Sequence, residues 1–365
     1  MNPIVSCHSC TEYGVEKILP LLETIYTQTH GPDLSGKTVL LKPNILFDED
    51  PNKSVTTHPV FVESVIRFLQ SRNVGKIFVG DAPALHSMSF KPLKSGIYEV
   101  CEKTDVEWVY FGKNTSTLSL PSGKTPVAGI IHEVDYIFSL PKLKTHELMG
   151  YTGAIKNTFG LIPHIHKTKQ HAFHRSSRSM ASFLVDLNES ITPDFIFMDA
   201  IVAMEGPGPG NGYPFPLHLI LGSTNPLALD IIATKIIGYL PLDIETNIEG
   251  LKRGKWLAST EEIVVQGNDI EQYIRSDFKL IPKVSLLKMG LGIVLRRIPF
   301  LRNLERRPVF FKNRCIGCKA CVNICSVKAL HVSPNDTKKI VISNKKCIRC
   351  FCCHEVCPAN AIEIK

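Results

Sequence analysis

The sequence has no long hydrophobic run. Nowhere do about eighteen apolar residues follow one another without a charge, so no membrane span is predicted. The stretch MNPIVSCHSC lacks the basic start and apolar run of a secretory signal, and a cytoplasmic location is expected. Cysteine is scarce before residue 315, with Cys7, Cys10 and Cys101, whereas nine of the twelve cysteines follow. This distribution favours metal ligation in the tail over a disulfide framework.

Acidic residues are scarce in the last part of the chain. Residues 279–365 carry 18 Lys and Arg against 4 Asp and Glu, whereas the rest carries 24 against 30. A nucleic-acid-binding protein normally has a basic face on its main domain, so this charge distribution argues against nucleic acid as a partner. The basic stretch 279–314 is interpreted as a connecting segment that packs on the body. A weak peripheral membrane contact through 279–314 is the alternative.

The sequence also lacks the glycine-rich loops that bind nucleotides. GPGPGNG at 206–212 ends without Lys-Ser/Thr and has no G-x-G-x-x-G spacing. It is interpreted as a rigid turn or lid whose glycines allow close backbone approach. No flavin or nicotinamide fingerprint is present, which leaves a further cofactor in the body undetermined.

The tail contains a repeat with an offset of 32 residues. CIGCKACVNIC and CIRCFCCHEVC each follow the bacterial ferredoxin spacing C-x2-C-x2-C-x3-C, in which the fourth cysteine ligates the other cluster. Zinc ribbons, the alternative, use pairs of CxxC knuckles instead of triplets. Cys352 falls outside the spacing and is interpreted as a packing residue. Two [4Fe-4S] clusters are predicted, the first held by Cys315, Cys318, Cys321 and Cys357, and the second by Cys347, Cys350, Cys353 and Cys325.

The first 278 residues alternate short apolar runs with amphipathic stretches. This pattern predicts an α/β fold with a mostly parallel sheet and flanking helices. The expected domains are a body at 1–278, a basic linker at 279–310 and a small α+β, two-cluster ferredoxin-like domain at 311–365. Strands are expected at 37–42, 76–80, 135–140, 194–199 and 217–221, and helices over much of 15–28, 59–72, 178–191 and 226–238.

Polar residues follow all five predicted strands. If these strands are parallel, their carboxyl ends share the edge where open α/β sheets bind ligands. Each loop taken alone has a structural alternative; Asn225, for example, precedes Pro226 and suits a helix start. We predict substrate-binding roles for Lys42, Asn44, Asp81, Lys142, Asn157, Glu205 and Asn225.

The segment 140–175 is a basic island in an otherwise acidic body. In its first half, lysines alternate with apolar residues and glycines. We expect these lysines to face a small anionic substrate. We predict catalytic roles for Lys144, His146 and Lys156. His146 is the expected proton donor near neutral pH, because its unperturbed pKa is about 6.5. A metal site at His164 and His166 is a weaker alternative.

Several motifs together resemble one family. KPN, GDAPA, PKLKTH, GAIKNTFG, EGPGPGNG and STNPLALD, followed by the ferredoxin tail, resemble the domain-of-unknown-function 362 family of iron–sulfur proteins. The resemblance covers nearly the whole chain and implies this domain layout without naming a substrate.

The expected function is that of an iron–sulfur oxidoreductase or electron-transfer protein. Its clusters would pass electrons to the small anionic substrate, with an external low-potential electron donor or acceptor as partner. Two alternatives stay open: a non-catalytic binding or regulatory protein with structural or redox-sensing clusters, and a ligase- or transferase-like enzyme.

Overall fold

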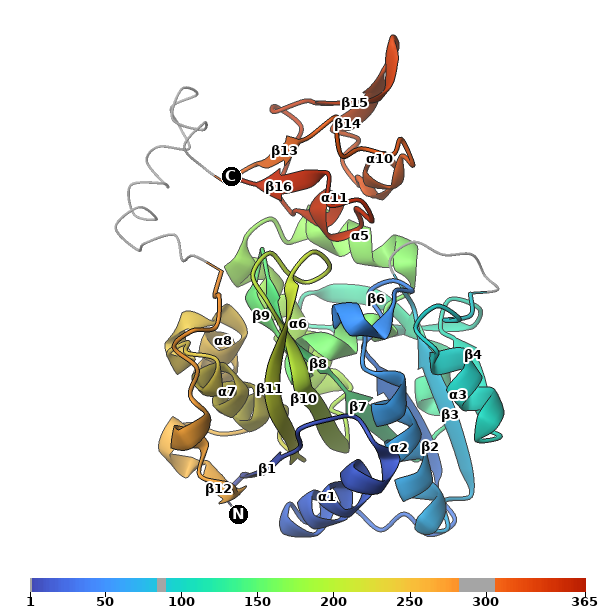
Figure 1. Ribbon diagram of the computed structural model, residues 1–365, viewed down its shortest axis with the longest axis vertical. Coiled ribbons are helices and arrows are strands. Elements are labelled where there is room, and N and C mark those ends of the chain that lie inside the picture. Colours follow the sequence, from blue (N-terminus) through green and yellow to red (C-terminus); the bar gives the residue numbers. More distant parts are fainter. Residues whose placement is uncertain (1, 84–89, 282–305) are drawn as a thin grey trace.

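A ten-stranded sheet forms the centre of the body in the computed structural model, which describes residues 2–83, 90–281 and 306–365 (Figure 1). Its strands are β1 (Ile4–Ser9), β2 (Thr38–Pro43), β3 (Lys76–Asp81), β4 (Glu107–Tyr110), β7 (Tyr136–Leu140), β8 (Lys142–His146), β9 (Gly150–Thr152), β10 (Phe195–Glu205), β11 (Tyr213–Ser223) and β12 (Val264–Gly267). The main path runs β12-β1-β11-β10-β7-β2-β3-β4, and β10-β7-β2-β3-β4 is parallel throughout. The predicted α/β class with a mostly parallel sheet is confirmed.

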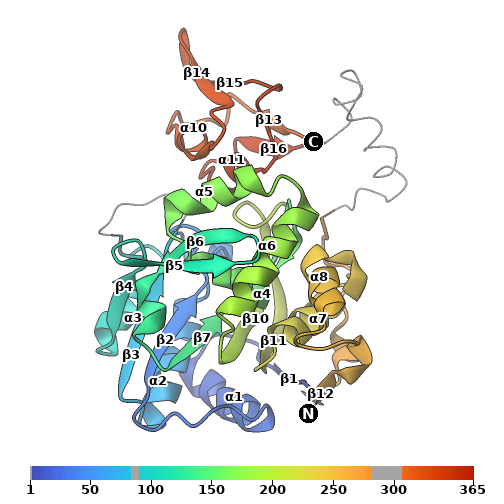
Figure 2. The same ribbon diagram turned by 180° about the vertical axis from the view of Figure 1, so that it is seen from behind.

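Helices cover both faces of this sheet, so the body has three layers (Figures 1 and 2). Alternate strand residues enter different cores. Val39 and Leu41 pack with helices of one face, whereas Leu40 packs with those of the other. The first face carries α1 (Val15–Gln28), α2 (Pro59–Ser71) and α3 (Ile97–Lys103); the second carries α4 (Ala154–Asn157), α6 (Ser177–Ser190) and α7 (Pro226–Ile236). All four predicted helices, now α1, α2, α6 and α7, are confirmed.

Smaller elements complete the body. A hairpin of β5 (Thr115–Leu120) and β6 (Gly123–Ala128) stands apart from the main sheet, and α5 (His164–Phe173) and α8 (Glu245–Arg253) add two further helices. Short 3-10 turns lie at Pro51–Lys53, Gly129–His132, Thr158–Leu161, Pro241–Asp243, Thr260–Glu262 and Ile270–Tyr273.

Two predicted strands form a hairpin and are not parallel neighbours. The expected strands 194–199 and 217–221 extend to β10 and β11, which pair antiparallel from Ile196 opposite Ser223 to Glu205 opposite Tyr213. The end of β11 therefore lies at the opposite edge from the ends of β10 and β2. The five predicted loops therefore do not meet at one edge. The apolar runs at 194–199 and 217–221 resemble buried parallel strands, so the sequence pattern does not show that the two strands are antiparallel.

The tail repeats its backbone as well as its sequence. It contains α10 (Ala320–Ile324), α11 (Cys352–Glu355) and two antiparallel pairs, β13 (Pro308–Phe310) with β16 (Ile362–Ile364) and β14 (Leu330–Ser333) with β15 (Asp336–Ile342). Positive φ angles recur at the sequence offset of the cysteine repeat. The matched positions are Gly317 with Arg349, Lys319 with Phe351, and Lys328 with Asn360.

The tail sits on the body through the short helix α11 (Figure 1). Asn211, in the turn between β10 and β11, donates to the carbonyl oxygen of His354 at 2.8 Å. Arg306 pairs with Glu147 of the body. A Cβ added to Gly210 would lie 2.8 Å from the Glu355 carbonyl oxygen, so a glycine there lets the two backbones approach closely. The interpretation of 206–212 as a turn of this kind agrees with this contact.

The expected linker is described only at its two ends. Ile281 is buried and its N–H donates to the Tyr239 hydroxyl at 3.1 Å, so the chain still packs on the body there. Pro308–Phe310, at the other end, pair with β16 of the tail. Residues 282–305, which hold most of the linker and of the segment considered for membrane contact, lie outside the described residues.

Candidate active site at the carboxyl edge of the sheet

A pocket lies where the ends of β2 and β3 meet the tail. Parallel order places β2 beside β3, and α4 follows β9 to bring a third segment to the same edge. The body contributes Lys42, Asn44, Asp81, Lys156, Asn157, Lys167 and His171, and the tail contributes Ile324, Cys352, Glu355 and Val356. The structure thus brings together five predicted site residues with four tail residues whose contribution was not predicted.

The first cation of this pocket is already neutralised. The Lys42 ammonium lies 3.1 Å from Asp81 Oδ2 and 2.8 Å from the Pro43 carbonyl oxygen. Asp81 also accepts backbone N–H groups from Ile45 and Ala82 at 2.8 and 2.7 Å. Burial lowers the pKa of Lys42, and the Asp81 carboxylate opposes that shift. This pair holds the ends of β2 and β3 together and has little bonding capacity left for a ligand.

Two asparagines link the pocket lysines. Asn157 Oδ1 accepts from Lys42 at 3.3 Å and from Asn44 at 3.2 Å, while its amide donates to the Lys42 carbonyl oxygen and to Ser139. Asn44 Oδ1 in turn accepts from Lys144 at 2.7 Å. Both amides are therefore committed to protein partners, and their role in the pocket is to fix the lysines.

Lys144 is buried behind Asn44 and does not line the pocket. Its ammonium donates to Asn44 and, at 2.7 Å, to the Val55 carbonyl oxygen, and no acid pairs with it among the described residues. Burial lowers its pKa well below 10.5, and the positive charges of Lys156 and Lys142 lower it further. Such a buried amine can exist uncharged near neutral pH.

Lys156 is the free cation of the pocket. Its side chain is partly exposed, and no hydrogen bond or salt bridge joins its ammonium to any residue that the structure describes. Burial lowers its pKa, whereas Glu355 and Cys352 of the tail raise it. A lysine placed in this way can bind an anionic group as a compact point charge.

His146 lies beneath the tail and is buried. Its Nδ1 accepts backbone N–H groups from Leu148 and Met149 at 3.1 and 3.3 Å, so the neutral ring carries its proton on Nε2. Nε2 lies 3.4 Å from Glu355 Oε1. Burial lowers the pKa of His146 well below 6.5, and the charge of Lys156 adds to the shift. This shift favours the neutral ring near neutral pH, and the role of proton donor stays a prediction.

Two pocket residues of α5, Lys167 and His171, have strongly shifted pKa values and were not among the predicted site residues. Burial lowers the pKa of Lys167 to about 7, with Asp81 opposing the shift and Lys42 adding to it. Burial and the charge of Lys156 lower the pKa of His171 to about 3. Both belong to the basic island recognised in the sequence, but their burial depends on how α5 packs over the sheet edge. Of these two residues, Lys167 is the one whose pKa lies near neutral pH.

Three predicted binding residues lie elsewhere. Lys142 reaches Asp199 at 2.9 Å and the Tyr13 hydroxyl at 2.8 Å, away from the pocket. Glu205 accepts the Lys279 N–H at 2.8 Å and holds the last described segment of the body. Asn225 caps α7 by accepting the Ala228 N–H at 3.0 Å, at the opposite edge of the sheet. The structure gives each of these side chains a structural partner and leaves them outside the pocket.

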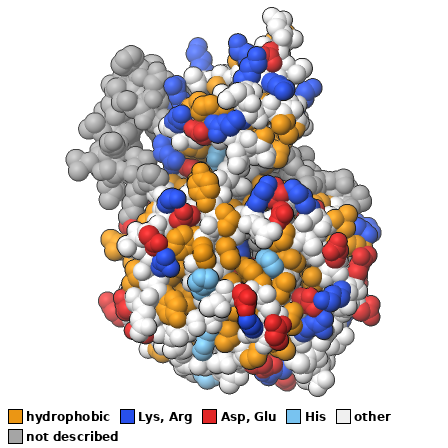
Figure 3. All heavy atoms as spheres, in the orientation of Figure 1, with side chains coloured by type: hydrophobic (Ala, Val, Ile, Leu, Met, Phe, Trp, Pro, Cys, Tyr) orange, Lys and Arg blue, Asp and Glu red, His pale blue; other side chains and the backbone are white. Residues whose placement is uncertain are grey.

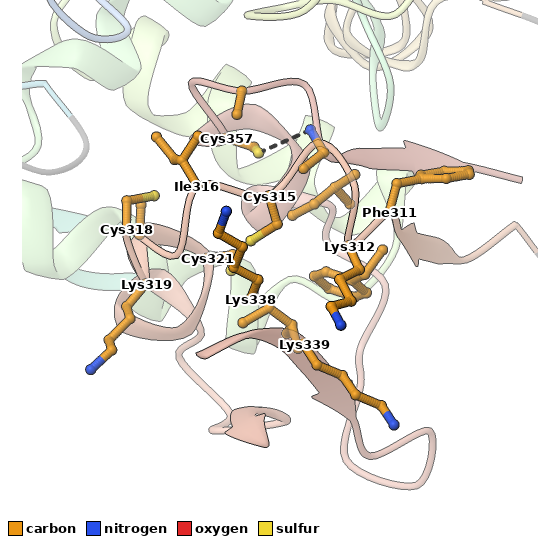
Figure 4. A pocket seen from close by; sticks show the side chains of 16 residues that line it. Phe311, Lys312, Cys315, Ile316, Cys318, Lys319, Cys321, Lys338, Lys339 and Cys357 are labelled. Atoms are coloured by element: carbon orange, nitrogen blue, oxygen red, sulfur yellow. Dashed lines mark hydrogen bonds between the residues drawn. The ribbon is translucent and has the colours of Figure 1, made fainter. Parts of the chain in front are cut away.

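The cysteines of the tail form two groups. Cys315, Cys318, Cys321 and Cys357 line one pocket, so the distant Cys357 joins the first triplet (Figure 4). Burial raises the pKa of Cys347, and the thiols of Cys350 and Cys325 raise it further. Burial likewise raises the pKa of Cys353, and Cys350, Cys347, Cys321 and Cys325 add to the shift. The first group thus joins one triplet to the fourth cysteine of the other run, whereas Cys353 is close to both Cys325 and Cys321, so the second ligand set stays a prediction.

This arrangement suits clusters better than single ions. Among residues 2–83, 90–281 and 306–365, no three His, Cys, Asp or Glu side chains lie close enough to hold one metal ion. Sulfurs spread around a pocket match ligands at the corners of a cube. Backbone N–H groups of Ala329 and Ala361 donate to Cys325 and Cys357 at 3.2 and 3.3 Å, and hydrogen bonds to sulfur of this kind tune iron–sulfur clusters. The donors present fit [4Fe-4S] clusters.

The fold and the pockets define a class: an α/β protein with a polar crevice at its sheet edge and a ferredoxin-type iron–sulfur domain docked on it. A model described as "Domain of unknown function (DUF362)" matches residues 39–235, and one described as "4Fe-4S dicluster domain" matches residues 314–361. The chain belongs to the DUF362 family, and its tail is a [4Fe-4S]-binding domain.

Three known proteins are similar to part of the chain, and the chain spans about two thirds or less of the length of each. A thylakoid-associated protein of Synechocystis sp. is 32% identical over 213 residues, which span 58% of this chain and 66% of that protein. The apoprotein of lactate racemase from Thermoanaerobacterium thermosaccharolyticum matches 61% of this chain and 54% of its own, with 15% identity and a TM-score of 0.39. A protein from Thermotoga maritima matches over 56% of this chain and 54% of its own chain, with 16% identity and a TM-score of 0.36. Within the described ranges no helix is both long and apolar enough to cross a bilayer.

Proposed function

We propose that the protein is an iron–sulfur oxidoreductase that passes electrons from its tail to a small anionic substrate held in the crevice. The observation that carries this proposal is the shared pocket. Cys352 and Glu355 of the tail line it together with Lys42, Asp81 and Lys156 of the body. A tail that served only to stabilise the fold would have no reason to complete a polar pocket of the body.

The tail is proposed to hold two [4Fe-4S] clusters, each supplying one electron at a time when bound. Cys315, Cys318, Cys321 and Cys357 are the proposed ligands of the first cluster, and Cys347, Cys350, Cys353 and Cys325 those of the second. The proposed division of the chain is a body at 1–278, a basic linker at 279–310 and an iron–sulfur domain at 311–365. Cys352 lies beside the second set without belonging to it, on the side that faces the crevice.

The chain's own residues bind the substrate and supply a proton. The unpaired ammonium of Lys156 binds the anionic group, and the Lys42–Asp81 pair with Asn44 and Asn157 keeps the edge rigid around it. Lys167, whose pKa is about 7, can release a proton near neutral pH. His146 Nε2 lies 3.4 Å from Glu355 Oε1 without a hydrogen bond between them, so both atoms stay available to a ligand.

The test is substrate-dependent reoxidation of the reduced protein. Anaerobically purified holoprotein is reduced with dithionite, freed of excess reductant and mixed with a panel of small carboxylates and phosphates, while its iron–sulfur absorbance is followed. We expect at least one anion to restore the oxidised spectrum, and Lys156→Ala to slow this step by on the order of 10²–10³. Lys124→Ala, an exposed lysine on β6, is the matched control and should react at the wild-type rate.

Two outcomes would overturn the proposal. If Lys156→Ala reacts as fast as the wild type with the active anion, the crevice is not where the substrate binds. If no anion of the panel is reduced while the clusters cycle reversibly, the binding or regulatory alternative replaces the enzyme.

A further inference from the structure

The first cysteine pocket opens on the surface of the tail. All of its lining residues belong to the tail, in contrast to the crevice, which the body and tail share. Cys318 is exposed at this pocket, and the neighbouring Ile316 is 62% exposed. One end of the tail is therefore buried against the body, and the other presents ligand cysteines to solvent.

Lysines surround this opening. Lys312, Lys319, Lys338 and Lys339 line the pocket, and all four are exposed. Figure 4 shows Lys319 and Lys339 extending away from the cysteine sulfurs, toward different sides of the opening. Figure 3 shows Lys and Arg side chains spread over the tail above the body.

The acids of the tail leave this positive charge uncompensated. Asp336 pairs with Lys312 at 2.6 Å, Glu363 pairs with Arg314, and Glu355 is buried in the crevice. Within the part of the chain that the structure describes, Lys319, Lys338 and Lys339 form no salt bridge. We name these three residues the lysine rim.

We propose that the lysine rim is the docking face for a small acidic one-electron carrier protein of the flavodoxin or ferredoxin type. Complementary charge guides such carriers to their partners and speeds association. Contacts of this kind are small and transient, so three lysines around one exposed apolar side chain, Ile316, suffice. The proposal rests on cluster binding by the tail and does not depend on the substrate of the crevice.

An acidic carrier explains this face better than an anionic lipid surface does. Binding at a membrane interface needs several apolar side chains to insert beside the cations. Ile316 is the single large hydrophobic residue that is exposed in the described part of the tail. The lysines also encircle the cysteine pocket itself, which is where an electron carrier must come closest.

The test measures binding apart from activity. Anaerobic holoprotein is titrated with an acidic flavodoxin by calorimetry at low and high ionic strength, and its iron content is recorded. We expect Lys319→Glu/Lys338→Glu/Lys339→Glu to raise the Kd by at least about tenfold at low salt, and the difference to shrink at high salt as charges are screened. The matched control, Lys113→Glu/Lys124→Glu/Lys252→Glu, reverses three exposed lysines of the body that form no salt bridge with any described residue.

The outcomes separate cleanly. Weakening confined to the rim variant, with iron content unchanged, supports the proposal. An unchanged Kd in the rim variant, or equal weakening in the control, overturns it. Rim-dependent binding to phosphatidylglycerol vesicles without flavodoxin binding also overturns it and assigns the face to lipid. None of these readouts involves the crevice, so failure here is distinct from failure of the proposed reaction.

Discussion

The tail and the body carry their chemistry in opposite ways. In the tail, the proposed ligands are close in sequence, and one short spacing is repeated with the same backbone turns. In the body, Lys42, Asp81 and Lys156 come from β2, β3 and α4 and meet only because β2 lies beside β3 and α4 packs over their ends. Cysteine spacing alone indicates a cluster, whereas the role of a lysine depends on which distant partner it finds.

The same contrast exists between two lysines of the crevice. Lys42 is buried against Asp81 and holds two strands together, whereas Lys156 lines the pocket and forms no salt bridge with any residue that the structure describes. Both are equally plausible as ligand contacts in the sequence. In the folded protein Lys42 stabilises the sheet edge, whereas Lys156 remains available to bind an anion.

The largest effect is expected where the tail's local pattern depends on a distant residue. Cys325→Ala should lose the cluster of Cys347, Cys350 and Cys353, about half of the bound iron, although Cys325 lies next to the first triplet in sequence. Iron analysis with electron paramagnetic resonance of the reduced variant measures this loss. Matching spectra from Cys347→Ala and Cys325→Ala are expected; spectra that match Cys315→Ala instead would break the crossed assignment.

The second effect is a difference in the free energy of unfolding between variants of Lys42 and of Lys156. Lys42→Ala removes one partner of a buried pair and leaves Asp81 without its counter-charge, which typically costs about 3–5 kcal/mol. Lys156→Ala breaks no pair and should stay within about 0.5 kcal/mol of the wild type. Denaturant unfolding of the body measures both variants. Equal destabilisation by the two substitutions would contradict the distinction.

A smaller effect is expected in the pH dependence of stability. Burial holds the pKa of His171 at about 3, below the value of about 6.5 in the unfolded chain. The unfolded chain therefore takes up a proton that the folded ring refuses, and stability falls as pH decreases from about 6.5 to about 3, by at most about 1.4 kcal/mol per pH unit. His171→Leu should remove this contribution. Thermal unfolding across the window tests it, and parallel pH profiles for variant and wild type would refute it.

The smallest effect is expected at Cys352, the one cysteine of the second run that lies outside the ligand spacing. Cys352 lies off the ligand spacing and faces the crevice, so Cys352→Ser should keep the iron content of the wild type. Iron analysis of the purified variant checks this. Loss of about half the iron would make Cys352 a ligand.

The sequence predicts the scaffold well and the crevice only in part. Helix periodicity and apolar runs predict α1, α2, α6 and α7 and the strands that carry Lys42 and Asp81, because these patterns are local. The hairpin of β10 and β11 escapes prediction, since strand direction depends on tertiary pairing, and with it the position of Asn225. Glu355 was missed because its position between the cysteines of the second run does not indicate that the tail folds back onto the body.

If the tail and the body complete one site, a bulky side chain placed at their contact should impair the reaction. A side chain at Gly210 would collide with the Glu355 carbonyl oxygen, whereas one at Gly14 meets only the flexible end of Glu16. We therefore compare reoxidation of the reduced protein by the active anion in Gly210→Val and Gly14→Val, at equal iron content. We expect a loss on the order of 10² in rate for Gly210→Val alone, because misplacement by about 1 Å is enough for such an effect. A wild-type rate in Gly210→Val would show that the tail and the crevice work apart.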